Sequence, residues 1–434
     1  MMASGSTTGG KGAAGPQFKN PQLVTPLADG ILVGGLSIAV IVVVLLVGLV
    51  MPTAYDSFSP PDPSGSVTAA EDDGTGMPGM IRLDHLALII ILQTMINGPH
   101  FMGSYWMLYS TPGQVKRYPW STIYMPILLV GMALLSVVLV AIGASMGQDA
   151  ASFDTVFQQA QLDNPSGPAS AVLASFQQVP LFAGGRAISM LMYAATLIYL
   201  AWHYNGQAWG MTASYCYMAG IRLHSSDRRL IRSGYRAMTA VHVCWVLMGN
   251  SRMFASPDTA ENITSMFITL IVLSFAVTIP LGIWGFRRAA RRNGRQIPLR
   301  AILPWMAVYF WYLLIFIHPY FFVLLQLFHA LQYLSFPFRV EANRHAARTD
   351  GRPGATWKRL LLLYLGLLAA GYLVFDLPPV LEMMERLAIR PFELAALVAS
   401  VINMHHYFAD GAIWKISNPD VRRDLFSHLT PRDT

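Results

Sequence analysis

Residues Ile31 to Met51 read "ILVGGLSIAVIVVVLLVGLVM", a stretch without a charged side chain that decides the class of fold. A helix needs about 20 apolar residues to cross the hydrocarbon core of a bilayer, and this stretch has that length. Comparable apolar runs recur along the 434-residue chain, which is 54% hydrophobic and only 12% charged. Soluble domains carry about twice that share of charged residues. The sequence therefore predicts an integral membrane protein that crosses the bilayer several times.

The apolar runs predict an all-α polytopic membrane helix bundle of about ten transmembrane helices, or eight to ten if some runs do not span. The expected spans are Ile31–Met51, Asp84–Tyr109, Thr122–Met146, Ala187–Met218, Arg236–Phe254, Thr264–Phe286, Ile302–Ile317, Pro319–Phe338, Lys358–Phe375 and Arg390–Trp414. The seventh and eighth runs form either one long helix kinked at His318–Pro319 or two short helices.

Charged residues in the connecting segments predict the orientation. With ten spans, every basic loop falls on the same side as both termini, and the alternate loops are acidic or neutral. The positive-inside rule makes the basic side cytoplasmic, and we expect the inner membrane of a bacterium. The net charge of +7 therefore reflects topology, and no nucleic-acid partner is expected. The expected organisation is a disordered cytoplasmic tail (1–30), the bundle (31–416) with an outer loop (147–186), and a C-terminal cytoplasmic tail (417–434).

Histidines recur within the even-numbered expected spans. His100, His203 and His405 each lie about 16 residues from the outer end of their helix, or roughly 24 Å, and His329 about 10 residues from it. Ionisable side chains in a membrane usually face the bundle interior and mark a functional site. A lone histidine there is more often hydrogen-bonded to a neighbouring helix. Four at one depth favour a metal or haem site, because neutral imidazole binds iron, copper and zinc.

Other polar side chains at this depth predict a supporting shell. Tyr333 and Asp410 each lie four residues after a histidine, and with His406 they are expected to orient the ligands or handle protons. His405 and His406 point about 100° apart, so only one of them can be a ligand. Four further residues are candidates for orienting ring nitrogens: Asn205, Gln207, Ser104 and Tyr109. His242 is expected to be structural.

The order of the histidine motifs resembles the Brp/Blh family of bacterial membrane β-carotene dioxygenases, which make retinal. "GPHF" at His100 and "WHYNG" at His203 are similar to the first two motifs of that family. "HALQYLSF" at His329 is similar to the third, and "HHYFAD" places His405 five residues before Asp410, as in the last. The likeness covers about a tenth of the chain.

This resemblance implies that His100, His203, His329 and His405 hold a non-haem Fe(II), where dioxygen reacts with an apolar polyene that enters from the lipid. The chain departs from the family pattern at two positions. Ser104 stands where an acidic residue is expected, and Tyr333 stands where a histidine is expected.

The predicted function is oxygen-dependent cleavage or oxidation of a lipophilic substrate such as a carotenoid or another isoprenoid. Two alternatives remain open: a haem b-binding electron-transfer subunit and a proton-coupled transporter. Membrane lipid is an expected partner, and a membrane partner subunit is left open. The sequence contains no Walker loop, dinucleotide-binding glycine motif or nucleophile elbow, and it lacks the histidine boxes of membrane desaturases.

Overall fold

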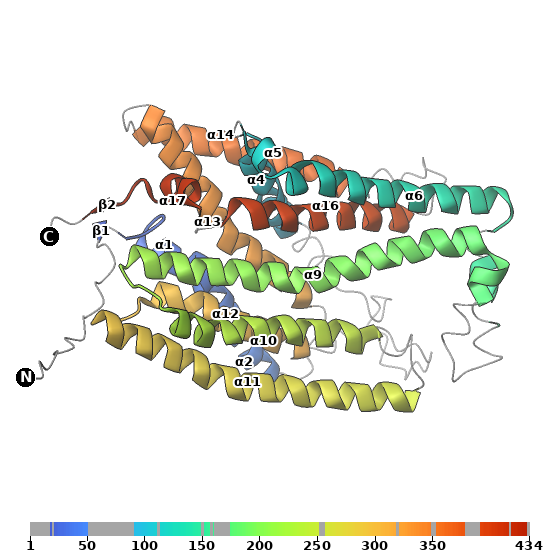
Figure 1. The fold of residues 1–434 in the computed structure, drawn as a ribbon, viewed down its shortest axis with the longest axis horizontal. Helices are drawn as coiled ribbons and strands as arrows, with labels where there is room; N and C mark the ends of the chain where they lie inside the picture. The colour runs from blue at the N-terminus through green and yellow to red at the C-terminus, as the bar shows by residue number, and fades with distance from the viewer. Residues whose placement is uncertain are drawn as a thin grey trace, which may run out of the picture.

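The computed structural model describes residues 18–19, 21–50, 91–110, 113–148, 152–156, 159, 174–250, 257–317, 321–348, 353–377, 391–415 and 418–431. Within these residues the chain forms a bundle of long helices, most of which run along one common direction (Figure 1). The predicted all-α class is therefore confirmed.

Helices occur at every expected span, although some end residues of the spans fall outside the described ranges. The α-helices are α1 (Pro26–Gly30), α2 (Leu36–Val50), α4 (Gly98–Tyr109), α5 (Gln114–Arg117), α6 (Met125–Ser145), α9 (Pro180–Met218), α10 (Ser225–Asn250), α11 (Pro257–Asn293), α12 (Leu299–Ile317), α13 (Phe322–Arg348), α14 (Pro353–Gly371), α16 (Pro391–Ile413) and α17 (Pro419–Phe426). In the described ranges, four π-helical segments adjoin them: η1 (Ile31–Gly35), η3 (Gln93–Asn97), η4 (Trp120–Tyr124) and η7 (Tyr372–Asp376). Helix α12 ends at Ile317 and α13 begins at Phe322, and residues 318–320, where a single kinked helix would have continued, lie outside the described ranges.

Five described stretches are long and apolar enough to cross a membrane: Pro26–Leu46, Trp120–Ser145, Pro180–Met218, Asp258–Asn293 and Thr356–Asp376. Helices α4, α13 and α16 are not among them. The first is only 12 residues long, and the other two carry several polar side chains that lower their hydropathy. Each of these three helices carries one of the histidines described below, and the polar residues of that site account for part of their lower hydropathy.

The two ends of the described chain meet at one end of the bundle. Strands β1 (Phe18–Lys19) and β2 (Thr430–Pro431) pair antiparallel there. Residues 18–19 and 21–30 were expected in a disordered tail, but they contain β1 and α1, and Leu23 and Asp29 are fully buried. Residues 1–17 lie outside the described ranges. The predicted C-terminal tail, 417–434, contains α17 and β2.

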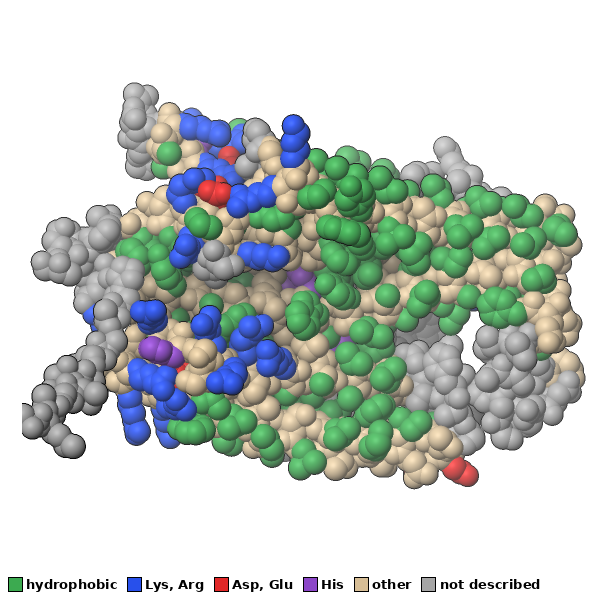
Figure 2. All heavy atoms as spheres, viewed as in Figure 1, with side chains coloured by type: hydrophobic (Ala, Val, Ile, Leu, Met, Phe, Trp, Pro, Cys, Tyr) green, Lys and Arg blue, Asp and Glu red, His purple; other side chains and the backbone are tan. Residues whose placement is uncertain are grey.

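Basic side chains gather at this same end of the molecule. Figure 2 shows Lys and Arg side chains toward the end that carries β1 and β2, and hydrophobic side chains over the rest of the visible face. Both ends of the described chain therefore lie on the basic side, where the positive-inside rule predicts the cytoplasm.

Helix α9 is the central element, because it contacts α6, α10, α12, α13 and α16. Its 39 residues span about 58 Å, longer than the hydrocarbon core. It begins at Pro180, earlier than the expected Ala187, with proline in the first turn, where a missing N–H costs nothing. It ends at Met218, and Gly220 follows with a φ of 68° that favours glycine. The N–H of Ile221 then bonds to Cys216 O at 2.8 Å.

Helices α4 and α14 approach each other at a pair of glycines. A Cβ atom on Gly371 would lie 2.7 Å from Cα of Gly98, so only glycine allows this backbone contact. Gly98 is two residues before His100. The contact therefore fixes the position of the first histidine relative to the bundle.

Candidate metal centre

Four histidines from four helices converge inside the bundle. His100 lies on α4, His203 on α9, His329 on α13 and His406 on α16, and one ring nitrogen from each lies within 4.8 Å of those of the others. All four residues are buried, with at most 7% of their surface exposed. The structure therefore brings the predicted histidine layer together, with one change in its membership. We call these four residues the histidine group.

Ring-nitrogen distances within the group match those around a shared cation. Nε2 of His203 lies 3.0 Å from Nε2 of His329 and 3.2 Å from Nε2 of His406. Metal–nitrogen bonds of about 2.1 Å would separate two ligand nitrogens by about 3.0 Å at a right angle and about 3.4 Å in a tetrahedron. A neutral ring nitrogen has either one N–H or one lone pair, so Nε2 of His203 cannot satisfy both neighbours by hydrogen bonding alone. A cation would satisfy all three nitrogens, so these residues fit a bound metal.

Asp410 lies beside the histidine group on α16. Its Oδ1 accepts hydrogen bonds from Ser104 Oγ at 2.5 Å and Tyr333 OH at 3.3 Å. Its Oδ2 lies 3.8 Å from Nε2 of His203 and 3.7 Å from Nε2 of His406, and has no hydrogen-bond donor among the described residues. Two hydroxyl groups thus hold one carboxylate beside the nitrogens, where its negative charge would stabilise a bound cation.

Tyr333 is held from two further sides. Its ring meets that of His100 at 4.3 Å between centroids, in an edge-on arrangement, and its OH accepts a hydrogen bond from Trp414 Nε1 at 3.1 Å. Ser104 Oγ lies 2.5 Å from the same OH. Ser104 and Tyr333 therefore meet each other and Asp410 beside the histidine group.

The expected ligand His405 lies outside the histidine group, and His406 takes its place. His405 Nε2 donates to Ser121 O at 2.7 Å, and its ring stacks on Tyr105 with centroids 5.1 Å apart. The residues are adjacent on one helix, so about 100° separates their side chains and the rotation of α16 decides which one faces inward. Sequence reasoning chose His405 for its spacing to Asp410, whereas His406 shares a helix face with Asp410 at i, i+4.

The other predicted polar residues have mostly structural contacts. Asn205 donates to Ala201 O and Tyr312 OH, and Gln207 donates to His329 O at 3.1 Å, which orients the backbone of one histidine rather than a ring. Tyr109 OH donates to Thr122 O and lies 3.4 Å from His405.

His242 is outside the group, as predicted. It bonds to Tyr312 OH and Leu197 O.

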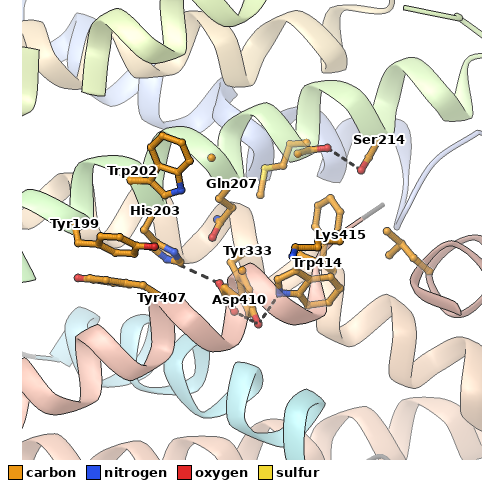
Figure 3. Close-up of a pocket in the computed structure, with 16 residues that line it drawn as sticks. Tyr199, Trp202, His203, Gln207, Ser214, Tyr333, Tyr407, Asp410, Trp414 and Lys415 are labelled. Carbon is orange, nitrogen blue, oxygen red and sulfur yellow. Dashed lines mark hydrogen bonds and ion pairs between the residues drawn. The ribbon is translucent and has the colours of Figure 1, made fainter. Parts of the chain in front are cut away.

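A cavity of about 220 Å³ extends from the histidine group between α9 and α16. Figure 3 shows its labelled lining residues, with Trp202, His203 and Gln207 on one wall and Tyr407, Asp410 and Trp414 on the other. Gly206, Gly210 and Gly411 also line it, and a Cβ atom on any of them would meet nothing within 4 Å. Most of the lining is aromatic or glycine, so the cavity fits an apolar molecule.

A second, much smaller space lies on the other side of the histidine group. It has a volume of about 10 Å³, and all four histidines line it together with Asn97, Phe101, Leu200, Tyr204, Gln326, Asn403 and Tyr407. This is room for about one water molecule. The histidine group therefore separates a small polar space from a larger apolar cavity.

Comparison of the chain with protein-family models, with curated proteins and with solved structures found no match. The fold and the site themselves define the class. This is a helical integral membrane protein with a buried group of four histidines that could hold a metal ion.

Proposed function

We propose that this protein is an integral-membrane oxygenase that holds iron(II) at the histidine group and oxidises a lipophilic substrate. The observation that carries the proposal is the convergence of ring nitrogens, with Nε2 of His203 close to Nε2 of both His329 and His406. Nitrogen ligands suit iron, copper and zinc, and four neutral ligands add no negative charge to the bilayer interior. The resemblance to the Brp/Blh family supports iron among these metals.

The residues around the metal would have distinct roles. His100, His203, His329 and His406 would hold the ion, and His406 would act as a ligand rather than in proton handling. Asp410 would balance part of the metal charge, held in place by the hydroxyl groups of Ser104 and Tyr333. Bound iron would supply activation of dioxygen.

The cavity between α9 and α16 supports a lipophilic substrate. Trp202, at its edge, is 61% exposed on the outside of the bundle, where lipid would lie. An apolar molecule could therefore pass from the bilayer to the histidine group without crossing water. Cleavage of one carbon–carbon double bond by one O2 molecule puts one oxygen atom on each product carbonyl, so no further reductant is needed. A carotenoid or another isoprenoid would supply such a bond.

Haem b is less compatible with this geometry. Two axial histidines place their rings on opposite faces of a wide, flat macrocycle. Here the ring of His203 lies only 4.7 Å from that of His329 and 4.8 Å from that of His406, between centroids. A porphyrin would have to separate rings that are already neighbours.

An absorption spectrum with metal analysis tests the proposal. We expect about one iron per chain without a Soret band. A Soret band would show haem, and protein without metal would favour the transporter or a structural role.

Expression in a host that makes β-carotene tests the substrate. We expect loss of colour and accumulation of retinal with the wild-type protein but not with His203→Ala. Unchanged pigment with the wild type would exclude this carotenoid as substrate. The variant His405→Gln, which keeps a donor for Ser121 O, is the matched control and should behave as the wild type.

A further inference from the structure

The small space beside the histidine group has a regular polar lining. Asn97, Gln326 and Asn403 precede His100, His329 and His406 by three residues each. Residues three apart lie on the same face of a helix, about 4.5 Å apart along its axis. The fourth histidine, His203, has Leu200 at the equivalent position, and all eight residues line the small space. We call Asn97, Gln326 and Asn403 the amide tier.

The amide tier lies on the side of the histidine group away from the basic end. Helices α9, α13 and α16 run toward the end that carries β1 and β2, so a residue earlier in each helix is farther from that end (Figure 1). The large cavity extends the other way, to Trp414 and Lys415 (Figure 3). A metal at the histidine group would thus have two different faces.

The amide tier retains hydrogen-bond donors that no described residue uses. The side chain of Asn97 has no hydrogen-bond partner in the described part of the chain. Gln326 Oε1 accepts from Gln93 Nε2 at 3.3 Å, which leaves its NH2 group free within the same ranges. Asn403 Nδ2 donates one hydrogen to Ala399 O at 2.7 Å and has a second one. Carboxamide side chains with unused N–H groups therefore line the space next to the histidine group.

The size of the space restricts what can bind there. About 10 Å³ is room for a molecule of the size of water, and far too little for a lipid chain. The three amides are half-buried whereas the histidines are buried, so the amide side is the more exposed side of the space. The occupant must be small, must reach the metal from this side, and must accept a hydrogen bond.

We propose that the amide tier is the subsite for a small ligand of the bound metal that accepts hydrogen bonds from carboxamide N–H groups. One atom of this ligand would occupy the small space next to the metal, and the rest would extend between the half-buried amides. In the proposed oxygenase this ligand is dioxygen, and the lipid occupies the large cavity on the other face. The inference rests on the proposed function for its metal. It adds that dioxygen and the lipid approach the metal from opposite sides. The evidence is that the amide tier and the large cavity lie on opposite sides of the histidine group.

Azide binding to the cobalt(II)-loaded protein tests the subsite without turnover. Azide is a small anion that binds metals, and the visible spectrum of cobalt(II) reports both metal loading and azide binding. Asn97→Leu and Gln326→Met should each leave the cobalt spectrum in place and weaken azide binding about tenfold or more, because each removes a hydrogen bond to a charged acceptor. Two variants are used so that misfolding of one does not decide the result.

Gly210→Leu is the matched control in the large cavity. It adds bulk where a Cβ atom meets nothing within 4 Å, and azide affinity should not change. Unchanged azide affinity in both amide variants would overturn the inference, as would loss of azide binding in Gly210→Leu. Wild-type protein without a cobalt spectrum would instead refute the metal site of the proposed function, and the subsite with it.

Discussion

Next to a bound metal, Asp410 would supply a negative charge beside four neutral imidazoles. Asp410→Asn keeps the size of the side chain and an oxygen for Ser104 to donate to, but it removes the charge. Supporting groups of this kind typically change metal affinity by about 10- to 100-fold, so we expect a loss of that size. Competition with a chelator measures it.

Ser104→Ala is the comparison for this substitution. It removes one hydrogen bond to the carboxylate and leaves the charge, so the loss of metal affinity should be smaller than in Asp410→Asn. Equal metal affinity in Asp410→Asn and the wild type would contradict a role for the carboxylate.

At the level of residues, the sequence correctly predicted that histidines line the site, but it did not identify every histidine that does so. The depth of the histidines along their helices pointed to one layer, and His100, His203 and His329 are in it. The choice between His405 and His406 depended on the rotation of α16, which its packing against α9, α4 and α6 decides. The amide tier was missed, although the three-residue spacing of Asn97, Gln326 and Asn403 to a histidine is visible in the sequence.

At the level of elements, the contact between α4 and α14 should determine the position of His100 and therefore the affinity of the site for metal. In Gly371→Ala the new methyl group would lie 2.7 Å from Cα of Gly98, so the helices must separate. Overpacking of this kind costs about 1–3 kcal/mol, and displacement of His100 should also weaken metal binding. Thermal unfolding in detergent and chelator competition measure the two effects.

Gly366→Ala on the same helix is the matched control, because a Cβ atom there meets nothing within 4 Å. It should stabilise α14 slightly, since alanine is a better helix former than glycine by about 1 kcal/mol. Equal destabilisation by both substitutions would mean that the glycine contact is unimportant.

His428 docks the C-terminal segment on the bundle. Its Nε2 donates to Gln22 O at 2.8 Å, and its Nδ1 accepts from Asn343 Nδ2 at 3.3 Å, so the neutral ring fits this site. Burial lowers the pKa of His428 below its ordinary value of 6.5, and Arg339 lowers it further, while the hydrogen bond to Gln22 and the charge of Asp29 act in the opposite direction.

The direction of this shift predicts release of the segment in acid. The released histidine binds a proton more readily than the docked one, so docking is intact above pH 6.5 and weakens as the pH falls below it, toward the lowered pKa. The protection of residues 418–431 against hydrogen exchange, measured relative to the intrinsic exchange rate at each pH, should therefore fall as the pH is lowered from about 7.5 to about 5.5. In His428→Gln this loss of protection should be absent, and its persistence would assign the effect to another group.

Among the elements, long apolar runs were predicted well and short docked segments were not. Spans such as that of α6 can be recognised from their length and hydropathy alone. The segments α1, α17, β1 and β2 have at most eight residues each, too few for a periodic pattern, and they are held by contacts far apart in the sequence. One of these contacts, His428 with Gln22, joins the two tails. Such pairing depends on the folded bundle.

For the whole molecule, both chain ends should lie in the cytoplasm. Green fluorescent protein fused to either end should fluoresce, and alkaline phosphatase fused to either end should be inactive, because the basic end carries both β1 and β2. Active phosphatase at either end would reverse the orientation. The control is an insertion of each reporter into the predicted outer loop, 147–186, which should give the opposite pattern.

The metal content of three proteins purified side by side tests the central claim most directly: the wild type, His406→Ala and His405→Gln. The two variants change adjacent residues of α16, only one of which belongs to the histidine group. We predict about one metal ion per chain in the wild type and in His405→Gln, and nearly none in His406→Ala. Equal metal content in all three, or loss of metal in His405→Gln alone, would contradict the account.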